Sequence, residues 1–219
     1  MATAGDTGID CAMSTEGIEA ALQETGLKGL NSEALAQFET YLELLLKWNA
    51  RMNLTAAREP GEIVRRHFLE SIQCARALPE DCERTLLDFG SGAGFPGIPI
   101  AICRPEIRIT LAESQRKKAA FLWEAVRALA LNAEVFDGRV EDMADDRRFG
   151  VVTLRAVDKM EEACGIASER MAAGGWIVVF ATERTEMRLK AALPGIQWRS
   201  KLVAASLRQG RIWVGRREE

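Results

Sequence analysis

The sequence has few of the residues that build metal sites and disulfide frameworks. Among its 219 residues there is one histidine, His67, and none of the five cysteines belongs to a C-x-x-C pair. A structural zinc site needs four closely spaced Cys or His ligands, and a disulfide framework needs a regular set of paired cysteines. The composition therefore argues against both, and we predict no metal-binding residues.

Long apolar runs are missing as well. No segment approaches the roughly 18 consecutive apolar residues that cross a bilayer, and residues 1–17 lack the basic and apolar regions of a signal peptide. We therefore expect a cytoplasmic protein with reduced thiols and no membrane partner.

The sequence also lacks a large excess of positive or negative charge. The chain carries 29 Lys and Arg residues against 32 Asp and Glu residues, a net charge of -3, which by itself disfavours a nucleic-acid binder. However, residues 184–217 hold nine Lys and Arg residues and one Glu, a local +8 that leaves -11 on the rest of the chain. Local groups of cations contact phosphates, so this segment predicts RNA binding that weakens with salt. The same cations would equally suit solvated helix and strand faces.

The residues that are present are typical of a globular α/β chain. Hydrophobic residues make up 47% and charged residues 28%, and the length suits one full domain with an appendage. Residues 1–13 have no periodicity and predict a disordered tail. Residues 14–80 predict a helical section, and residues 81–219 predict a ligand-binding α/β domain. We expect the last two parts to form one compact unit.

The apolar patterns also predict individual elements. Strands alternate with helices from residue 84 onward, which predicts a doubly wound parallel sheet, and two final segments around Gln209-Gly210 predict an antiparallel hairpin. Gly174-Gly175 is expected to end the helix near 159–172. The expected helices are 15–25, 32–48, 60–78, 114–130 and 159–172, and the expected strands are 85–89, 107–112, 133–136, 150–154, 175–180, 198–204 and 211–216.

A glycine-rich turn follows the first predicted strand. Asp88 lies near the end of that strand, and Gly90, Gly92 and Gly94 alternate directly after it. Glycine lets the backbone adopt positive φ and approach a ligand closely at the carboxyl end of a strand, where open α/β sheets bind ligands. The turn therefore predicts a nucleotide-type site.

Two ligand classes compete for this turn. Residues 92–97 formally fit the G-x-G-x-x-G dinucleotide pattern, with Glu113 placed 21 residues after Gly92. A dinucleotide pattern begins directly after its strand, whereas here Gly90 comes first. The arrangement of Asp88, the three glycines and Glu113 is more similar to the S-adenosylmethionine (SAM) site of class I methyltransferases, in which the second acid suits a ribose diol. We favour SAM and keep an NAD(P)-dependent oxidoreductase as the alternative.

Eight short motifs together resemble one methyltransferase family, the RsmG (GidB) family of 16S ribosomal RNA guanine-N7 methyltransferases. The resemblance covers roughly residues 30 to 180. Its motifs are Lys47-Trp48-Asn49, Asn53-Leu54-Thr55, Arg65-Arg66-His67, DFGSGAGFPGIP from Asp88 to Pro99, Arg104-Pro105, Glu113-Ser114, Arg139-Val140-Glu141 and Leu154-Arg155-Ala156.

The resemblance implies a fold, a reaction and partners. The fold is a Rossmann-like, mostly parallel seven-stranded sheet with an N-terminal helical section, in which residues 81–219 bind SAM. The reaction is methylation of N7 of guanine 527 in 16S rRNA. The implied partner is the small ribosomal subunit, with no DNA, and we expect a monomer.

The resemblance also implies roles for individual residues. Arg155, at the end of the fourth strand, would lie beside the methionine end of SAM and the target base. The other expected cofactor-binding residues are Gly90, Gly92, Gly94 and Phe95 around the pocket, Glu113 at the ribose, and Val140 and Glu141 beside the adenine.

Guanine N7 is a neutral acceptor, so it can attack a sulfonium methyl without a general base. We therefore expect the catalytic residues to be the substrate-contacting Arg139 and Arg155, since an arginine can donate two hydrogen bonds to guanine O6 or a phosphate. A surface ion pair is the alternative for Arg139. Glu141 would pair with either arginine or hold the adenine amino group, and His67 is expected to be a half-buried structural histidine.

One departure from the family keeps a third hypothesis open. The family usually has a lysine just after the fifth strand, where this chain reads Phe180-Ala181-Thr182-Glu183. A non-catalytic RNA-binding or assembly factor on a methyltransferase scaffold is therefore an alternative, and Arg184 is the candidate replacement. Of the five tryptophans, four are expected in the core, and only Trp198 is a candidate RNA contact.

Overall fold

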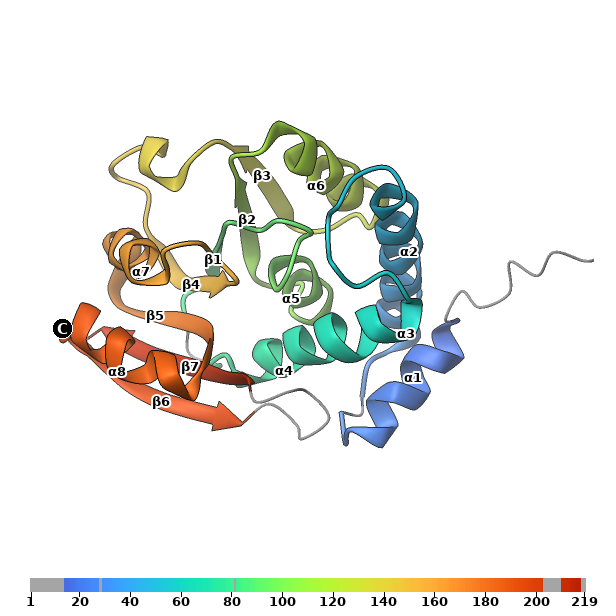
Figure 1. Ribbon diagram of the computed structural model, residues 1–219, viewed down its shortest axis with the longest axis horizontal. Coiled ribbons are helices and arrows are strands. Elements are labelled where there is room, and N and C mark those ends of the chain that lie inside the picture. Colours follow the sequence, from blue (N-terminus) through green and yellow to red (C-terminus); the bar gives the residue numbers. More distant parts are fainter. Residues whose placement is uncertain (1–13, 28, 81, 203–209, 218–219) are drawn as a thin grey trace, which may run out of the picture.

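Seven strands form one sheet in the order β3-β2-β1-β4-β5-β7-β6 (Figure 1). The computed structural model describes residues 14–27, 29–80, 82–202 and 210–217, so the tail predicted at 1–13 lies outside the described residues. β1 to β5 pair in parallel, and β7 lies antiparallel between β5 and β6. The strands are β1 (Thr85–Phe89), β2 (Arg108–Glu113), β3 (Ala133–Asp137), β4 (Phe149–Arg155), β5 (Met171–Thr182), β6 (Ile196–Leu202) and β7 (Gly210–Arg217). The predicted parallel sheet with a closing antiparallel hairpin is confirmed.

The first part of the chain is helical, as predicted. Asn31 caps the long helix α2, because its side chain accepts a hydrogen bond from the Ala34 N–H at 2.8 Å. The segment predicted as one helix over 60–78 contains a π turn, in which the Leu69 N–H bonds to the Val64 carbonyl. The elements are α1 (Thr15–Glu24), α2 (Ser32–Asn49), α3 (Pro60–Ile63), η1 (Val64–Phe68) and α4 (Leu69–Ala77).

Helices cover both faces of the sheet and bury two hydrophobic clusters. Neighbouring residues of a strand point to opposite faces, so Leu86 packs in the larger cluster and Leu87 in the smaller. The larger cluster also contains buried residues of α1, α2 and α4, so the helical section shares a core with the sheet. The smaller cluster packs under α7 and α8, at the left of Figure 1. The remaining helices are α5 (Gly97–Cys103), α6 (Arg116–Ala128), η2 (Val140–Asp142), α7 (Met160–Glu169) and α8 (Glu183–Ala192).

The sequence-based expectation was wrong about one element boundary. Helix α7 ends at Glu169, and Gly174-Gly175 lies inside β5. Gly174 has a φ of +64°, and the register of β5 against β4 shifts between Phe149 and Val151. The glycines therefore accommodate an irregularity in a strand instead of capping a helix. The helices α5 and α8 were not anticipated.

Candidate functional site

The glycine-rich turn joins β1 to α5 at the carboxyl edge of the sheet. Gly90, Gly92 and Gly94 have φ values of 69°, 58° and 91°, the left-handed region that glycine adopts without strain. A Cβ on Gly94 would lie 2.4 Å from the Ile98 side chain, whereas a Cβ on Gly90 would meet only Val157, at 3.5 Å. Gly94 is therefore required for packing, whereas the surroundings of Gly90 leave room beside the backbone.

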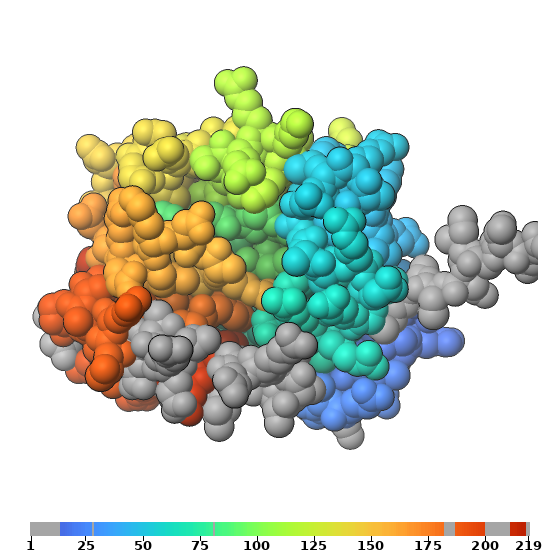
Figure 2. All heavy atoms as spheres, in the orientation of Figure 1, coloured from blue at the N-terminus to red at the C-terminus, as the bar shows by residue number. Residues whose placement is uncertain are grey.

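The turn lies on a recessed face of the molecule. In Figure 2, the green residues that include the turn lie deep between the cyan residues of the N-terminal section and the yellow and orange residues that follow β3 and β4. This depression is where the carboxyl ends of β1, β2 and β4 meet, since these strands are parallel neighbours. Ligands of open α/β sheets bind at this edge.

Asp88 anchors the turn through hydrogen bonds to the residues around it. Its carboxylate is fully buried, and it accepts hydrogen bonds from the Thr153 hydroxyl at 2.8 Å and from the Gly97 N–H at 3.2 Å. Burial raises the pKa of Asp88 to about 6, although these hydrogen bonds oppose the shift. Asp88 therefore links β1, β4 and the start of α5.

Glu113 ends β2, as predicted, and faces the turn. One carboxylate oxygen accepts a hydrogen bond from the Gly92 N–H at 2.9 Å, and the other accepts one from the Gln115 N–H at 2.7 Å. A carboxylate offers about four lone-pair sites, so two remain for hydroxyl groups of a ligand. Glu113 thus positions the turn and keeps acceptor capacity at its mouth.

Phe95 connects the turn to the helical section. Its side chain is 7% exposed, and its ring centroid lies 5.5 Å from that of Tyr41 and 6.0 Å from that of Phe68. The Tyr41 hydroxyl donates a hydrogen bond to the Ala93 carbonyl at 2.6 Å. The N-terminal helices therefore brace the turn directly.

Arg155 ends β4, as predicted, but its side chain is only 11% exposed. Its Nη2 donates to a Glu70 carboxylate oxygen at 2.5 Å and to the Arg66 carbonyl at 3.1 Å. Its guanidinium carbon lies 5.6 Å from the Phe95 ring centroid and 5.3 Å from that of Phe180. Burial lowers the pKa of Arg155 and raises that of Glu70, while their mutual attraction favours both charged forms. The expected substrate contact is therefore an arginine already engaged with the protein.

His67 is satisfied on both ring nitrogens. Its Nδ1 lies 2.7 Å from Nη2 of Arg155, and its Nε2 lies 3.0 Å from the Thr55 hydroxyl. Arginine can only donate, so Nδ1 accepts, and Nε2 carries the proton that it donates to Thr55. Burial first, and then the charges of Arg155 and Arg66, lower the pKa of His67 to about 3. The histidine is therefore neutral near pH 7 and has the structural surroundings that we predicted.

Asn49, from the motif Lys47-Trp48-Asn49, shapes the loop that follows α2. It is 5% exposed, its side-chain oxygen accepts from the N–H groups of Leu54 and Thr55, and its amide donates to the Ala57 carbonyl. Because Thr55 also contacts His67, this loop is tied to the Arg155 cluster.

Arg139 differs sharply from Arg155. It precedes η2, it is exposed, and within the described part of the chain it has no ion pair, so the surface ion pair considered as its alternative role is not present there. Val140 is buried at 3% exposure and Glu141 is exposed. Glu141 pairs with neither arginine among the described residues; Arg155 pairs with Glu70 instead.

Sequence reasoning missed Glu70 and Tyr41. Glu70 follows the Arg65-Arg66-His67 motif within the same helical stretch, but only the fold shows that it meets Arg155. Tyr41 is the single tyrosine of the chain and lies on the apolar stripe of α2. A hydroxyl on a buried helix face needs a hydrogen-bond partner, so the position of Tyr41 in the sequence could have indicated a contact with another part of the chain.

The tryptophans depart from expectation at one position. Trp213 is buried, Trp48 and Trp176 are partly buried against the larger cluster, and Trp198 is partly buried against the smaller one. Trp123 on α6, expected in the core, is 53% exposed. The expectation for Trp123 was therefore wrong: its position faces away from the buried side of α6.

Several cations of the basic C-terminal segment are engaged with the protein. Arg188 pairs with Glu161 at 3.4 Å, Arg216 donates to a backbone carbonyl at 3.3 Å, and Arg217 donates to another at 2.6 Å. The side chain of Arg184 lies outside the described residues. The described cations of this segment thus include three that contact β5, α7 or the end of α7 and are not simply solvated.

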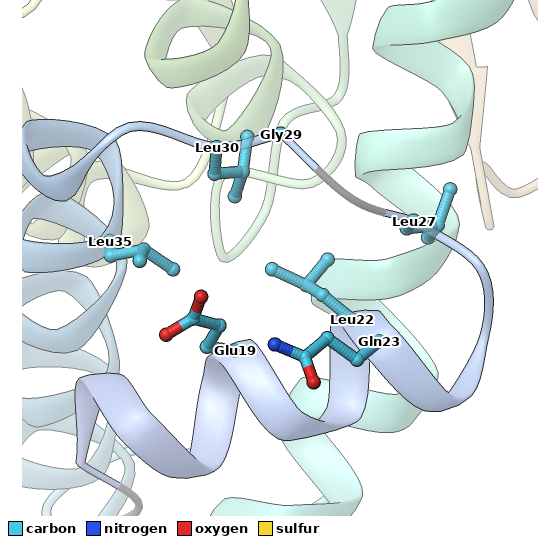
Figure 3. Close-up of a pocket in the computed structure, with 7 residues that line it drawn as sticks. All are labelled: Glu19, Leu22, Gln23, Leu27, Gly29, Leu30 and Leu35. Atoms are coloured by element: carbon cyan, nitrogen blue, oxygen red, sulfur yellow. The ribbon is translucent and has the colours of Figure 1, made fainter.

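Some cavities of the described structure lie away from the turn. One of about 560 Å³ is lined by residues that include Arg76, Glu80 and Arg104. A cavity of about 340 Å³ between α1 and the start of α2 contains none of the turn residues (Figure 3). Within residues 14–202 and 210–217, apart from the two undescribed positions, no three His, Cys, Asp or Glu side chains gather as metal ligands. No helix of the described chain is long and apolar enough to span a bilayer.

The sheet order and the glycine turn between Asp88 and Glu113 define a class I SAM-dependent methyltransferase fold. A predicted O-methyltransferase from Agrobacterium tumefaciens has a TM-score of 0.55 at 18% identity, over 70% of this chain and 81% of that one. The TYW2 protein of M. jannaschii, in complex with AdoMet, has a TM-score of 0.53 at 17% identity, over 67% and 73%.

Residues 34–207 match the family of rRNA small subunit methyltransferase G, and the chain belongs to this family of SAM-dependent enzymes. The ribosomal RNA small subunit methyltransferase G of Pelotomaculum thermopropionicum is 41% identical over 66% of this chain and 62% of that protein. The protein of the same name from Xanthomonas campestris is 40% identical over 68% of this chain and 69% of that protein.

Proposed function

We propose that this protein transfers the methyl group of SAM to N7 of guanine 527 in 16S rRNA of the small ribosomal subunit. The observation that carries the proposal is the Glu113 carboxylate bonded to the N–H of Gly92 at the carboxyl edge of the sheet, in a member of this family. We further propose that the enzyme acts in the cytoplasm as a monomer, without DNA or a membrane as partner.

The residues around the turn suit SAM. The free lone pairs of Glu113 can accept from the two ribose hydroxyls, and Gly90, Gly92 and Gly94 allow close approach to the backbone. Phe95 supports the turn from behind, since its ring is buried against Tyr41. A helix-bound pyrophosphate is not needed for this ligand.

Three further residues complete the proposed pocket. Val140 and Glu141 border the adenine, the first as an apolar contact and the second as an acceptor for the amino group. Arg155 lies towards the methionine end, where its ion pair with Glu70 fixes the wall of the pocket.

SAM supplies a methyl group on a positively charged sulfur. Guanine N7 is a neutral acceptor, so no residue has to remove a proton from it. His67 agrees with this chemistry because both of its nitrogens are engaged. The exposed guanidinium of Arg139 can donate two hydrogen bonds to guanine O6 or to a phosphate. Holding N7 and the methyl group in line can supply much of the acceleration, with effective molarities on the order of 10⁵ M or more.

The test is to incubate the protein with labelled SAM and small ribosomal subunits and to map the label on the rRNA. Label at N7 of guanine 527 is expected, and its absence would overturn the proposal. A parallel reaction with naked 16S rRNA identifies the form of the substrate.

The alternatives give different results. An oxidoreductase would bind NADH tightly and SAM weakly in separate titrations. A non-catalytic assembly factor would bind the subunit without transferring a methyl group, so turnover at an ordinary rate excludes it.

A further inference from the structure

Trp123 is an exposed aromatic side chain on an otherwise well-packed helix. Among the described residues, it and Met187 are the exposed large hydrophobic side chains, and Trp123 is 53% exposed. The buried face of α6 contains Phe121, Leu122 and Ala125, so the helix packs without it. A single exposed ring is ordinary on a protein surface, so Trp123 indicates a partner only together with the residues that surround it.

The exposed face of α6 around Trp123 is basic. At 3.6 residues per turn, Arg116, Ala120 and Arg127 share the face of Trp123, and Lys117 flanks it. Arg116, Lys117 and Arg127 are all exposed, and in the described structure none of them forms an ion pair. The neighbouring acid, Glu124, is engaged by α2, since it accepts from the Trp48 indole at 3.1 Å and lies 3.8 Å from Lys47 Nζ. The face therefore presents cations without free acids.

A shallow cavity continues this surface onto α2. It has a volume of about 310 Å³, and its lining combines apolar side chains with three cations and no acid. The lining residues are Lys47, Trp48, Arg51, Met52, Lys117 and Ala120.

The two elements that carry this surface, α6 and the end of α2, both lead to the proposed site. α6 begins three residues after Glu113, whose carboxylate accepts from the Gln115 N–H. Arg51 and Met52 open the loop that reaches Thr55, the hydrogen-bond partner of His67. A polymer whose target base enters the site can therefore reach α6 with its flanking residues.

We infer that Trp123 and the surrounding cations form a docking surface for single-stranded RNA next to the target guanine. Trp123 stacks on an unpaired base, and Arg116, Lys117 and Arg51 contact phosphates. Stacking platforms combined with cations are how proteins bind single strands without reading their sequence, and the surplus of unpaired cations favours RNA over an uncharged protein surface. The inference rests on the proposed function, because it places the rRNA flanks beside its site.

The experiment measures binding of a labelled single-stranded RNA that contains the target guanine and its flanking nucleotides, by fluorescence anisotropy. Trp123→Ala should weaken binding about tenfold, and Trp123→Phe should retain most of the affinity. Replacing both Arg116 and Lys117 by Gln should lower the slope of log affinity against log salt by about 1.4. Arg84→Gln, at an exposed cation just before β1 and at the opposite end of the strands from the turn, is the control and should change neither quantity.

SAM affinity by calorimetry and methylation of small subunits by the wild type separate this inference from the proposed function. A wild type that methylates guanine N7, together with variants that bind RNA like the wild type, overturns the docking surface alone. A second contrary result is that Trp123→Ala weakens binding to whole subunits but not to the isolated RNA. The surface would then contact a ribosomal protein, and the inference of an RNA docking surface would be overturned. If the wild type does not methylate rRNA, the proposed function is overturned. The RNA affinities of the variants would still decide whether the docking surface exists.

Discussion

The two arginines predicted to contact the substrate lie in opposite surroundings. Arg155 belongs to what we call the closed side of the site, where Asp88 is buried and Arg155, Glu70 and His67 are partly buried and hydrogen-bonded. Arg139 belongs to the open side, with Glu141 and Trp123, where the side chains are exposed. The motifs of one family therefore include residues that are packed and paired within the protein and residues that are exposed at its surface.

Desolvation explains why the two sides should respond differently to substitution. A buried charge that loses its partner remains in a poorly solvated place, so its removal costs stability. An exposed charge is solvated in either case, and its removal affects only the ligand that it contacts. Substitutions on the closed side should therefore change folding, and those on the open side should change activity alone.

The largest expected effect comes from Gly90→Asp, at the turn between the two sides. A carboxylate beside the backbone of this turn would occupy the space where a ligand approaches, so SAM affinity should fall at least about a hundredfold. Isothermal titration calorimetry measures the loss. Gly165→Asp on α7, where a Cβ meets nothing within 4 Å and which lies outside the turn, is the control and should bind SAM normally. Equal affinities for the two variants would contradict the placement of the site.

Arg155→Ala should destabilise the closed side of the site and abolish activity. Glu70 would be left buried without its partner, so the free energy of unfolding should fall by roughly 3–5 kcal/mol, and methyl transfer should be lost. Urea denaturation measures the first effect. The double variant Glu70→Gln with Arg155→Gln removes both charges and should recover part of the stability. Wild-type stability for Arg155→Ala would mean that Glu70 is not buried as described.

Asp88→Asn should change how stability depends on pH. Because the pKa of Asp88 is raised from 3.8 to about 6 in the folded state, its contribution is fully present below pH 3.8 and is lost as the pH rises through 6. The loss amounts to about 3 kcal/mol, and the amide variant should not show it. The difference in unfolding free energy between wild type and variant, measured from pH 4 to 7, isolates this group from other carboxylates. A difference that stays constant over this range contradicts the raised pKa.

Arg139→Gln should give the smallest effect and sharpen the contrast. Its exposed side chain has no ion pair in the described structure, so Tm should stay unchanged, while kcat/KM should fall roughly tenfold through a lost contact to guanine or phosphate. Single-turnover kinetics and thermal unfolding on the same samples measure both quantities. Arg84→Gln, at an exposed cation just before β1 and away from the turn, tests whether any lost cation has the same effect on the chemical step.

Much of the fold could be read from local patterns. The strands around Leu86 and Ile109 are short apolar runs bounded by turn residues, and the α2 stripe has an N-cap and a helical period, so each element carried its own signal. Gly174-Gly175 led to the wrong prediction of a helix end, because two glycines after a helical pattern are typical of a helix cap. The pairing of β5 with β4 shows that they lie at an irregularity within a strand.

The order of the elements, the glycine turn and the acid at the end of β2 follow from the sequence alone, because periodicity, turn chemistry and strand ends are local properties of the chain. The folded structure was needed to see that Arg155 pairs with Glu70, that Arg139 forms no ion pair within the described residues, and that Trp123 is exposed on a basic face. Burial and pairing depend on which residues distant in the chain meet, and Arg155 and Glu70 are 85 positions apart. The solvation of a charge, and with it the role of an arginine, is therefore a property of the folded molecule.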